Sequence, residues 1–235
     1  MNATPEPAAV GIEKWIVVDV ERILKLPERL RRLWPRELLP HTGVGSAGAA
    51  SAGGGVGSAS PGGADAGDLA VDDPVRSQRE LDVLTAWVAG FAAELNHVDA
   101  RVSVVVSSGG ETVHLALCLG GGAAQAVLAL QGEGFEDFSG HQLLRRIDWD
   151  RIGPVAEELA GLIEHDCVLT LTWAGPCAAA GLEFLHRRDG RWFRPVIDRR
   201  GDTITVDAET EAGAEAVRML LAAVLARVLK PETRR

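Results

Sequence analysis

The sequence has no tyrosine, and phenylalanine and tryptophan together make up only 5% of its 235 residues. It has no apolar run of the roughly 18 residues that a membrane-spanning helix requires. It also lacks the basic segment followed by an apolar one that marks a secretory signal peptide. From these absences we expect a cytoplasmic protein with no membrane insertion.

Cysteine is scarce as well, and the three cysteines have no metal-binding spacing. Cys167 and Cys177 flank a predicted turn, whereas Cys118 falls inside a predicted strand. A zinc site would need closely spaced pairs of ligands, and a small disulfide scaffold would need more cysteines. We predict buried thiols in a reducing compartment rather than a disulfide.

The sequence has no excess of positive charge, since 24 lysines and arginines stand against 33 aspartates and glutamates. The formal net charge is -9, and the acidic residues are spread along the chain. A nucleic-acid-binding domain needs clustered positive charge to contact phosphates. The composition therefore argues against a generic nucleic-acid-binding domain.

What the sequence does contain is a series of alternating apolar residues between Ala100 and Gln131. Such alternation is typical of strands with one buried face. The link at 108–111, SGGE, is short and can reach positive φ, so it predicts a hairpin. Three glycines at 120–122 separate a third strand from the second. We predict an antiparallel meander of three strands.

Composition divides the chain into four parts. An N-terminal helical element occupies 1–40, and a linker rich in glycine, alanine and serine occupies 41–74. The linker cannot bury enough apolar area to offset the cost of ordering its backbone, so we predict that it is disordered. The main α+β domain occupies 75–230, and a disordered tail occupies 231–235.

The N-terminal element is apolar and basic. The stretch from Trp15 to Val18 predicts a short strand or the start of a helix, and Leu30, Leu33 and Trp34 share one face of a following helix. Two interpretations of that face stay open. It binds a partner protein, or it docks on the sheet of its own chain.

The sequence of the main domain predicts the element order α-βββ-α-ββββ-α. Its first amphipathic helix is expected from a capping box that starts at Ser77 to Leu95. Two further helices are expected from near Asp150 or Pro154 to His165 and at about 210–229. Its last four strands are expected at 167–173, 181–188, 191–197 and 202–207. Pro195 marks the third of these as an edge strand or a bulge. Short links favour antiparallel pairing, so the class is α+β, with antiparallel sheet in two quasi-equivalent halves.

No motif of a catalytic or cofactor site occurs. The glycines at 120–122 precede a predicted strand rather than a helix, and no lysine stands nearby, which excludes a phosphate-binding loop. His114 and Cys118 share a strand face, but a metal site would need ligands from further elements. The other histidines of the main domain are scattered along the sequence, at His97, His141, His165 and His186. We expect no metal and no cofactor.

Acidic residues gather in the loop that follows the meander, at Glu133, Glu136 and Asp137. Nothing in their spacing marks a matched acid and base, and a solvated surface explains them. No serine or cysteine lies in a nucleophile motif either. We therefore expect no catalytic residues.

The sharpest charge feature is a basic stretch with aromatic residues, at 187–200. Its candidate partner-binding residues are Arg187, Arg188, Arg191, Trp192 and Arg194, and Arg199 and Arg200 extend it. Basic residues interleaved with aromatic ones suit single-stranded nucleic acid. Aspartates dilute the patch, however, and arginine stems that cover a solvated hairpin also explain it. A site for an acidic protein partner is the third interpretation.

The order of elements resembles the EspG family, the chaperones associated with ESX (type VII) secretion in actinobacteria. The resemblance runs roughly over 81–229. Its stretches are ARVSVVVSSGGETVHLAL with AAQAVLALQGEG, then FSGHQLLRRIDWDRIGPVAEELAGLI as a loop and amphipathic helix, and GLEFLHRRDGRW before the last helix. It implies two quasi-equivalent halves and a protein that binds and escorts helical secretion substrates. No functional residue carries over.

We therefore predict a non-enzymatic protein that binds another protein, with a secretion-associated chaperone as the specific hypothesis. The alternative is a nucleic-acid-binding module that uses the arginine-rich hairpins at 187–200. A small enzyme is a third hypothesis, and a deep pocket with convergent polar groups near the acidic loop would favour it.

Overall fold

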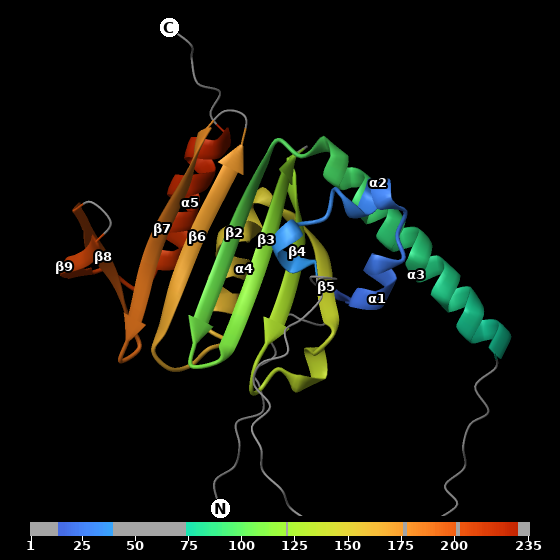
Figure 1. The fold of residues 1–235 in the computed structure, drawn as a ribbon, viewed down its shortest axis with the longest axis horizontal. Coiled ribbons are helices and arrows are strands. Elements are labelled where there is room, and N and C mark those ends of the chain that lie inside the picture. Colours follow the sequence, from blue (N-terminus) through green and yellow to red (C-terminus); the bar gives the residue numbers. More distant parts are fainter. Residues whose placement is uncertain (1–13, 40–73, 121, 176–177, 201–202, 230–235) are drawn as a thin grey trace, which may run out of the picture.

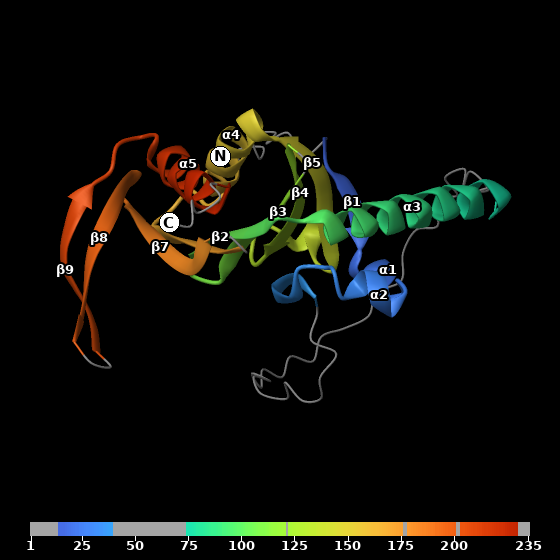
Figure 2. The same cartoon turned by 90° about the horizontal axis from the view of Figure 1, so that it is seen from above.

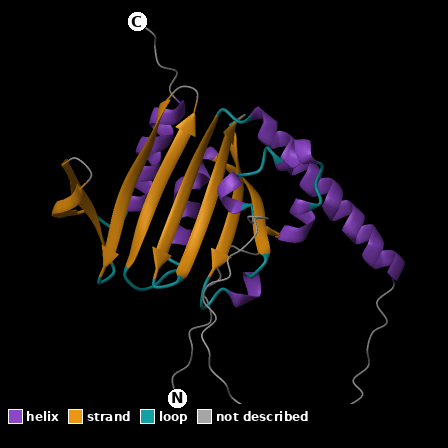
Figure 3. Cartoon of the chain, in the orientation of Figure 1, coloured by secondary structure: helices purple, strands orange, loops and turns teal. Residues whose placement is uncertain are grey.

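The computed structural model describes residues 14–39, 74–120, 122–175, 178–200 and 203–229. These residues form one large antiparallel sheet with helices on both faces (Figure 1, Figure 3). The fold is therefore α+β, as predicted, and most of it is sheet. The predicted tail and the predicted linker, apart from Pro74, lie outside the described residues, as does Cys177.

The sheet of the described residues has nine strands in the order β1-β5-β4-β3-β2-β6-β7-β8-β9, and every neighbouring pair is antiparallel. The strands are β1 (Ile16–Asp19), β2 (Ala100–Ser108), β3 (Glu111–Gly120), β4 (Ala123–Gln131), β5 (His141–Asp148), β6 (Cys167–Gly175), β7 (Ala178–Arg188), β8 (Arg191–Arg200) and β9 (Thr203–Glu211). The predicted meander of β2, β3 and β4 is confirmed. Gly109 and Gly110 turn its first hairpin at positive φ, which glycine adopts without strain.

Helices cover the two faces unequally (Figure 2). One face carries α4 (Trp149–Ala160) and α5 (Ala216–Leu229), whose apolar sides pack on β2 to β7. The other face carries α1 (Val20–Leu24), α2 (Glu28–Arg31), α3 (Pro74–Glu94) and three-residue helices η2 (Arg36–Leu38) and η3 (Leu95–His97). A last short helix, η4 (Glu136–Phe138), lies in the acidic loop. None of the described helices is long and apolar enough to cross a membrane.

Strands β3, β4 and β5 are buried on both faces, which differs from the predicted single buried face. Leu117 of β3 packs under α4 and α5, whereas its neighbours Ala116 and Cys118 pack under the N-terminal element. In β5, Leu143 and Leu144 point to opposite faces and both are fully buried. A strand covered on both faces has a continuous apolar run instead of alternation.

That double burial explains the strand that the sequence analysis missed. The sequence predicts a loop followed by a helix over this stretch, His141–Asp148, whose neighbouring pairs Leu143-Leu144 and Arg145-Arg146 do not follow a period of two. The structure makes it β5, paired with both β4 and β1. The first run of strands therefore has four members instead of three.

Three helix boundaries also differ from the prediction. Helix α3 begins at Pro74, before the predicted capping box at Ser77. Helix α4 ends at Ala160, before the expected His165. Strand β9 extends to Glu211, and α5 begins at Ala216 instead of near Thr210. The residues at 209–211 stay in the sheet because they pair with β8, and this pairing cannot be seen in a helical periodicity.

The N-terminal element packs on its own chain. β1 pairs with β5, and the side chain of Trp34 is fully buried against Phe91 of α3, with ring centroids 5.8 Å apart. Its indole nitrogen donates to Gln142 of β5, and the guanidinium of Arg101 donates to the carbonyl oxygen of Leu33. Of the two interpretations of this apolar face, docking on the sheet of its own chain is therefore confirmed.

Candidate functional site

Strands β7 and β8 separate three residue pairs after the turn that joins them. Asp189 and Gly190 form its turn with φ of 49° and 74°, which confirms the predicted Asp-Gly hairpin. The register then pairs Arg188 with Arg191 and ends at His186 with Phe193. Beyond this point β8 and β9 project away from the end of the sheet (Figure 1, Figure 2).

Pro195 gives the physical reason for the separation. In an antiparallel ladder, hydrogen-bonded pairs recur at every second residue, and the pair next to a two-residue turn is one of them. The series that starts at Arg188–Arg191 would therefore place Phe184 opposite Pro195. Proline has no N–H to donate there, so the ladder ends. A register shift between Val196 and Ile197 adds a bulge, which increases the local twist.

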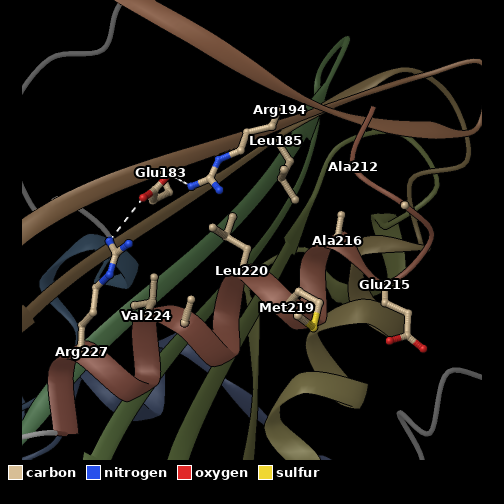
Figure 4. Close-up of a pocket in the computed structure, with 12 residues that line it drawn as sticks. Glu183, Leu185, Arg194, Ala212, Glu215, Ala216, Met219, Leu220, Val224 and Arg227 are labelled. Carbon is tan, nitrogen blue, oxygen red and sulfur yellow. Dashed lines mark hydrogen bonds and ion pairs between the residues drawn. The ribbon is translucent and has the colours of Figure 1, made fainter. Parts of the chain in front are cut away.

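The separation leaves a groove between the outer edge of β7, the start of β8 and helix α5 (Figure 4). It has a volume of about 420 Å³. Its apolar floor is formed by Leu185, Ala216, Leu220, Ala223 and Val224. Ala223 is exposed and Ala216 is partly exposed, whereas the other three belong to the core. Met219 lies at the border of the groove with 65% of its surface exposed, whereas methionine side chains are usually buried.

A shared carboxylate lies at one end of the groove. Glu183 of β7 accepts from Arg194 of β8 at 2.7 Å and from Arg227 of α5 at 3.4 Å (Figure 4). The side chain of Glu183 is 21% exposed, so these ion pairs are partly shielded from solvent. Two arginines on one carboxylate leave a positive charge that is not fully compensated within the trio.

The structure separates the predicted partner-binding residues into two groups. Arg187 is only 9% exposed, and its guanidinium donates to the carbonyl oxygens of Ala160 and His165 just past helix α4. It also lies over the ring of Trp192, 5.5 Å from the centroid. Its position therefore serves the fold and leaves little surface for a partner.

Three further arginines of this stretch, Arg188, Arg191 and Arg194, lie at the surface, and each is paired with a glutamate. Arg188 contacts Glu209 at 3.4 Å, and Arg191 contacts Glu211 at 3.6 Å. Arg194 contacts Glu183 and lines the groove. The side chains of Arg199 and Arg200 lie outside the described residues. Because Glu209 and Glu211 of β9 pair with Arg188 and Arg191, these two arginines lack the unpaired positive charge that phosphate binding needs.

A second cavity, of about 690 Å³, lies beside the acidic loop. Its polar lining includes Glu37, His114, Glu136 and His141. The side chains contact the protein itself: His114 Nε2 lies 2.7 Å from Ser103 Oγ, His141 Nε2 lies 3.7 Å from an Asp19 oxygen, and Glu136 accepts from a backbone N–H. The small-enzyme hypothesis expects a polar pocket near the acidic loop, and this cavity lies there.

Burial controls the titration of the groups under the N-terminal element. It lowers the pKa of His114 from its ordinary value, and the charge of Glu37 opposes this shift. Burial also raises the pKa of the Cys118 thiol to about 11, so that a thiolate is scarce at neutral pH. Cys118 and Cys167 are buried free thiols, as predicted. Within the described ranges, no group of histidine, cysteine and acidic residues could hold a metal ion.

Sequence reasoning identified Arg194 but missed the other residues of the groove. The apolar stripe of the last helix predicts a core position for Leu220 and Val224, which they have, and no motif marks Glu183 or the exposed Ala223. Pro195 was the available signal, since a proline in a strand predicts the end of a ladder. No protein-family model matches the chain, and no curated protein sequence matches it either.

Proposed function

We propose that this chain is a non-enzymatic protein-binding protein and that its partner binds in the groove between β7 and α5. The observation that carries this proposal is the apolar groove floor beside a strand edge without a partner strand in the described part of the chain. Apolar surface beside exposed backbone groups favours a macromolecular partner, because a chain can cover the first and hydrogen-bond the second.

The chemistry of the groove supports binding rather than catalysis. Its charged residues are Glu183, Arg194, Glu215 and Arg227, and three of them form one ion-paired trio. Among its described lining residues there is no serine, cysteine or histidine that could act as a nucleophile or a general base. Leucine, valine, alanine and methionine provide adaptable apolar contact instead.

A narrower proposal is that the protein is a secretion-associated chaperone that resembles the EspG family and escorts helical secretion substrates in the cytoplasm. The order of elements supports it. A four-stranded meander followed by a helix occurs twice, as β2 to β5 with α4 and as β6 to β9 with α5. The two runs meet through the antiparallel pair β2–β6, which is the arrangement expected of two quasi-equivalent halves.

Two exposed alanines on α5 provide a matched test. Ala223 lines the groove, whereas its neighbour Ala222 is exposed on the same helix outside it. We expect the tagged wild-type chain and Ala222→Arg to retain a stoichiometric protein partner from the native host, and Ala223→Arg to lose it. A helical substrate of the secretion system as that partner would support the narrower proposal. A wild-type chain that retains no protein would contradict the function itself.

A further inference from the structure

The outer edge of β7 is open along most of its length. Over 178–185, β7 has β6 on one side and no strand on the other among the described residues. In a strand, the backbone N–H and C=O groups of every second residue point to the same side. Those of His186 point toward β8, with which it pairs through Phe193, so those of Phe184 and Leu182 point toward the open side. Natural sheets usually protect such edges with proline, lysine or a covering element, yet the stretch AAAGLEFL contains no proline or lysine.

The geometry points to β-strand addition at this edge: an extended segment of a partner protein pairs with β7 and lays alternate side chains on the groove floor. This inference rests on the protein-binding function proposed above and specifies how the partner binds. A row of unpaired donors and acceptors along a strand is satisfied by the main chain of another strand, whereas a helix has already used its own backbone groups. A secretion substrate that is mostly helical would therefore bind this edge through an extended segment of its chain.

The shape of the opening selects a single segment rather than a second folded copy. β7 and β8 remain joined at Arg188–Arg191, so the space between them is a wedge that is closed at one end. The β7 edge of a second copy would bring its own attached β8–β9 hairpin into the same wedge. A segment with no strand attached on its far side avoids that clash.

The charges of the groove specify one side chain of the segment. Arg194 and Arg227 share the carboxylate of Glu183, and Glu215 already contacts Arg218 at 3.8 Å. A carboxylate entering between the two arginines would complete their pairing. Side chains two residues away on the same face of the segment would lie over the exposed or partly exposed apolar residues of the groove, Ala216, Met219 and Ala223, so we expect apolar residues at those positions.

Leu182 offers a substitution that removes only the outward hydrogen bond. Its side chain is 50% exposed on the face opposite the groove, so neither Leu182→Pro nor Leu182→Thr alters the floor. Proline at this position deletes the outward N–H, and threonine keeps it. Pro195→Val is a second variant, because it restores the N–H with which β8 can continue the ladder and close the wedge.

The test selects displayed random linear peptides of about ten residues, the upper length of common strands, on the full chain. We expect enriched peptides to alternate apolar residues and to carry an aspartate or glutamate. By fluorescence anisotropy, Leu182→Pro and Pro195→Val should weaken binding about tenfold or more, and Leu182→Thr should stay within about twofold. On the wild-type chain, peptide binding should slow amide hydrogen exchange at Leu182 and Phe184.

Two results would overturn strand addition. One is a peptide that binds Leu182→Pro and Leu182→Thr equally and leaves exchange at Leu182 and Phe184 unchanged, and the other is a selection without any enriched peptide. If the host protein lost by Ala223→Arg is still retained by Leu182→Pro, the binding function stands and only its strand-addition mode is wrong.

Discussion

The indole nitrogen of Trp34 donates a hydrogen bond to the side-chain oxygen of Gln142, 2.8 Å away, although the two residues are 108 positions apart in the chain. The amide nitrogen of Gln142 donates in turn to the carbonyl oxygen of Leu38. Gln142 is 2% exposed, so water cannot replace either partner. This pair of bonds attaches the N-terminal element to strand β5.

Gln142→Leu should therefore destabilise the protein more than an ordinary surface change. The substitution keeps a similar volume but leaves the indole N–H and the Leu38 carbonyl without partners. We expect the free energy of unfolding to fall by about 1–3 kcal/mol in urea denaturation. Gln131→Leu, at the exposed end of β4, is the control and should change it by less than about 0.5 kcal/mol. Equal effects of the two substitutions would show that the buried bonds contribute nothing.

Trp34→Ala should release the N-terminal element from the sheet. The side chain is fully buried, and removing a buried tryptophan costs about 3–5 kcal/mol. Cys118 lies beneath the same element, so its alkylation by iodoacetamide, followed by peptide mass spectrometry, reports the release. We expect slow labelling of Cys118 in the wild type, because it is buried and its thiol has a pKa of about 11, and faster labelling in the variant. Labelling that stays slow would mean that the element remains docked without Trp34.

His114 should make the protein less stable in mild acid. Its pKa is lowered in the folded state, whereas the unfolded chain has the ordinary value of 6.5. Stability from the neutral imidazole is thus fully present above pH 6.5 and is lost as the pH falls from 6.5 toward the lowered folded pKa, where the loss levels off. Urea denaturation across this range should show the decline in the wild type. The decline in stability should be smaller in His114→Gln. The control His97→Gln, which replaces an exposed histidine, should show the same decline as the wild type.

Arg187 and Arg191 should behave differently although the sequence treats them alike. Arg187→Met leaves the carbonyl oxygens of Ala160 and His165 without their donor, so we expect a loss of about 1–3 kcal/mol in stability. The Arg191 side chain is 68% exposed beside Glu211, and Arg191→Met should cost less than about 1 kcal/mol. Thermal or urea denaturation of the two variants makes the comparison. A larger loss for Arg191 would contradict the structural role of Arg187.

Single-stranded oligonucleotides should not bind the hairpins at 187–200. Arg188, Arg191 and Arg194 each contact a glutamate, and the chain carries a net charge of -9. Fluorescence anisotropy at low salt should show no binding that weakens steeply with added salt. Such binding, lost in the double variant with Arg191→Ala and Trp192→Ala, would instead favour the nucleic-acid alternative.

Short-range patterns predicted the strands that have one exposed face and the turns that join them. Alternation located β2, β6 and most of β7, and the Gly-Gly and Asp-Gly pairs located two hairpins. They failed at β5, because Leu143 and Leu144 are buried by elements that lie on opposite faces of the sheet. A second covering layer erases the alternation where large apolar residues lie on both faces, as in β5. In β3 the second face carries the small residues Ala116 and Cys118, so the large apolar residues still alternate.

The candidate site follows a similar division. Pro195 alone was enough to predict that a ladder would be interrupted, because a missing N–H is a property of the residue itself. Where the interruption matters depends on contacts between segments that are distant along the chain: α5 supplies the floor, and Glu183 joins β7 to Arg194 and Arg227. Likewise, a local pattern presented Arg187 as a surface arginine, and only packing against the end of α4 buried it. The hydrogen-bonding capacity of a residue and the periodicity of a segment are properties of the local sequence. The exposure of a side chain depends instead on which distant segments of the chain pack against it.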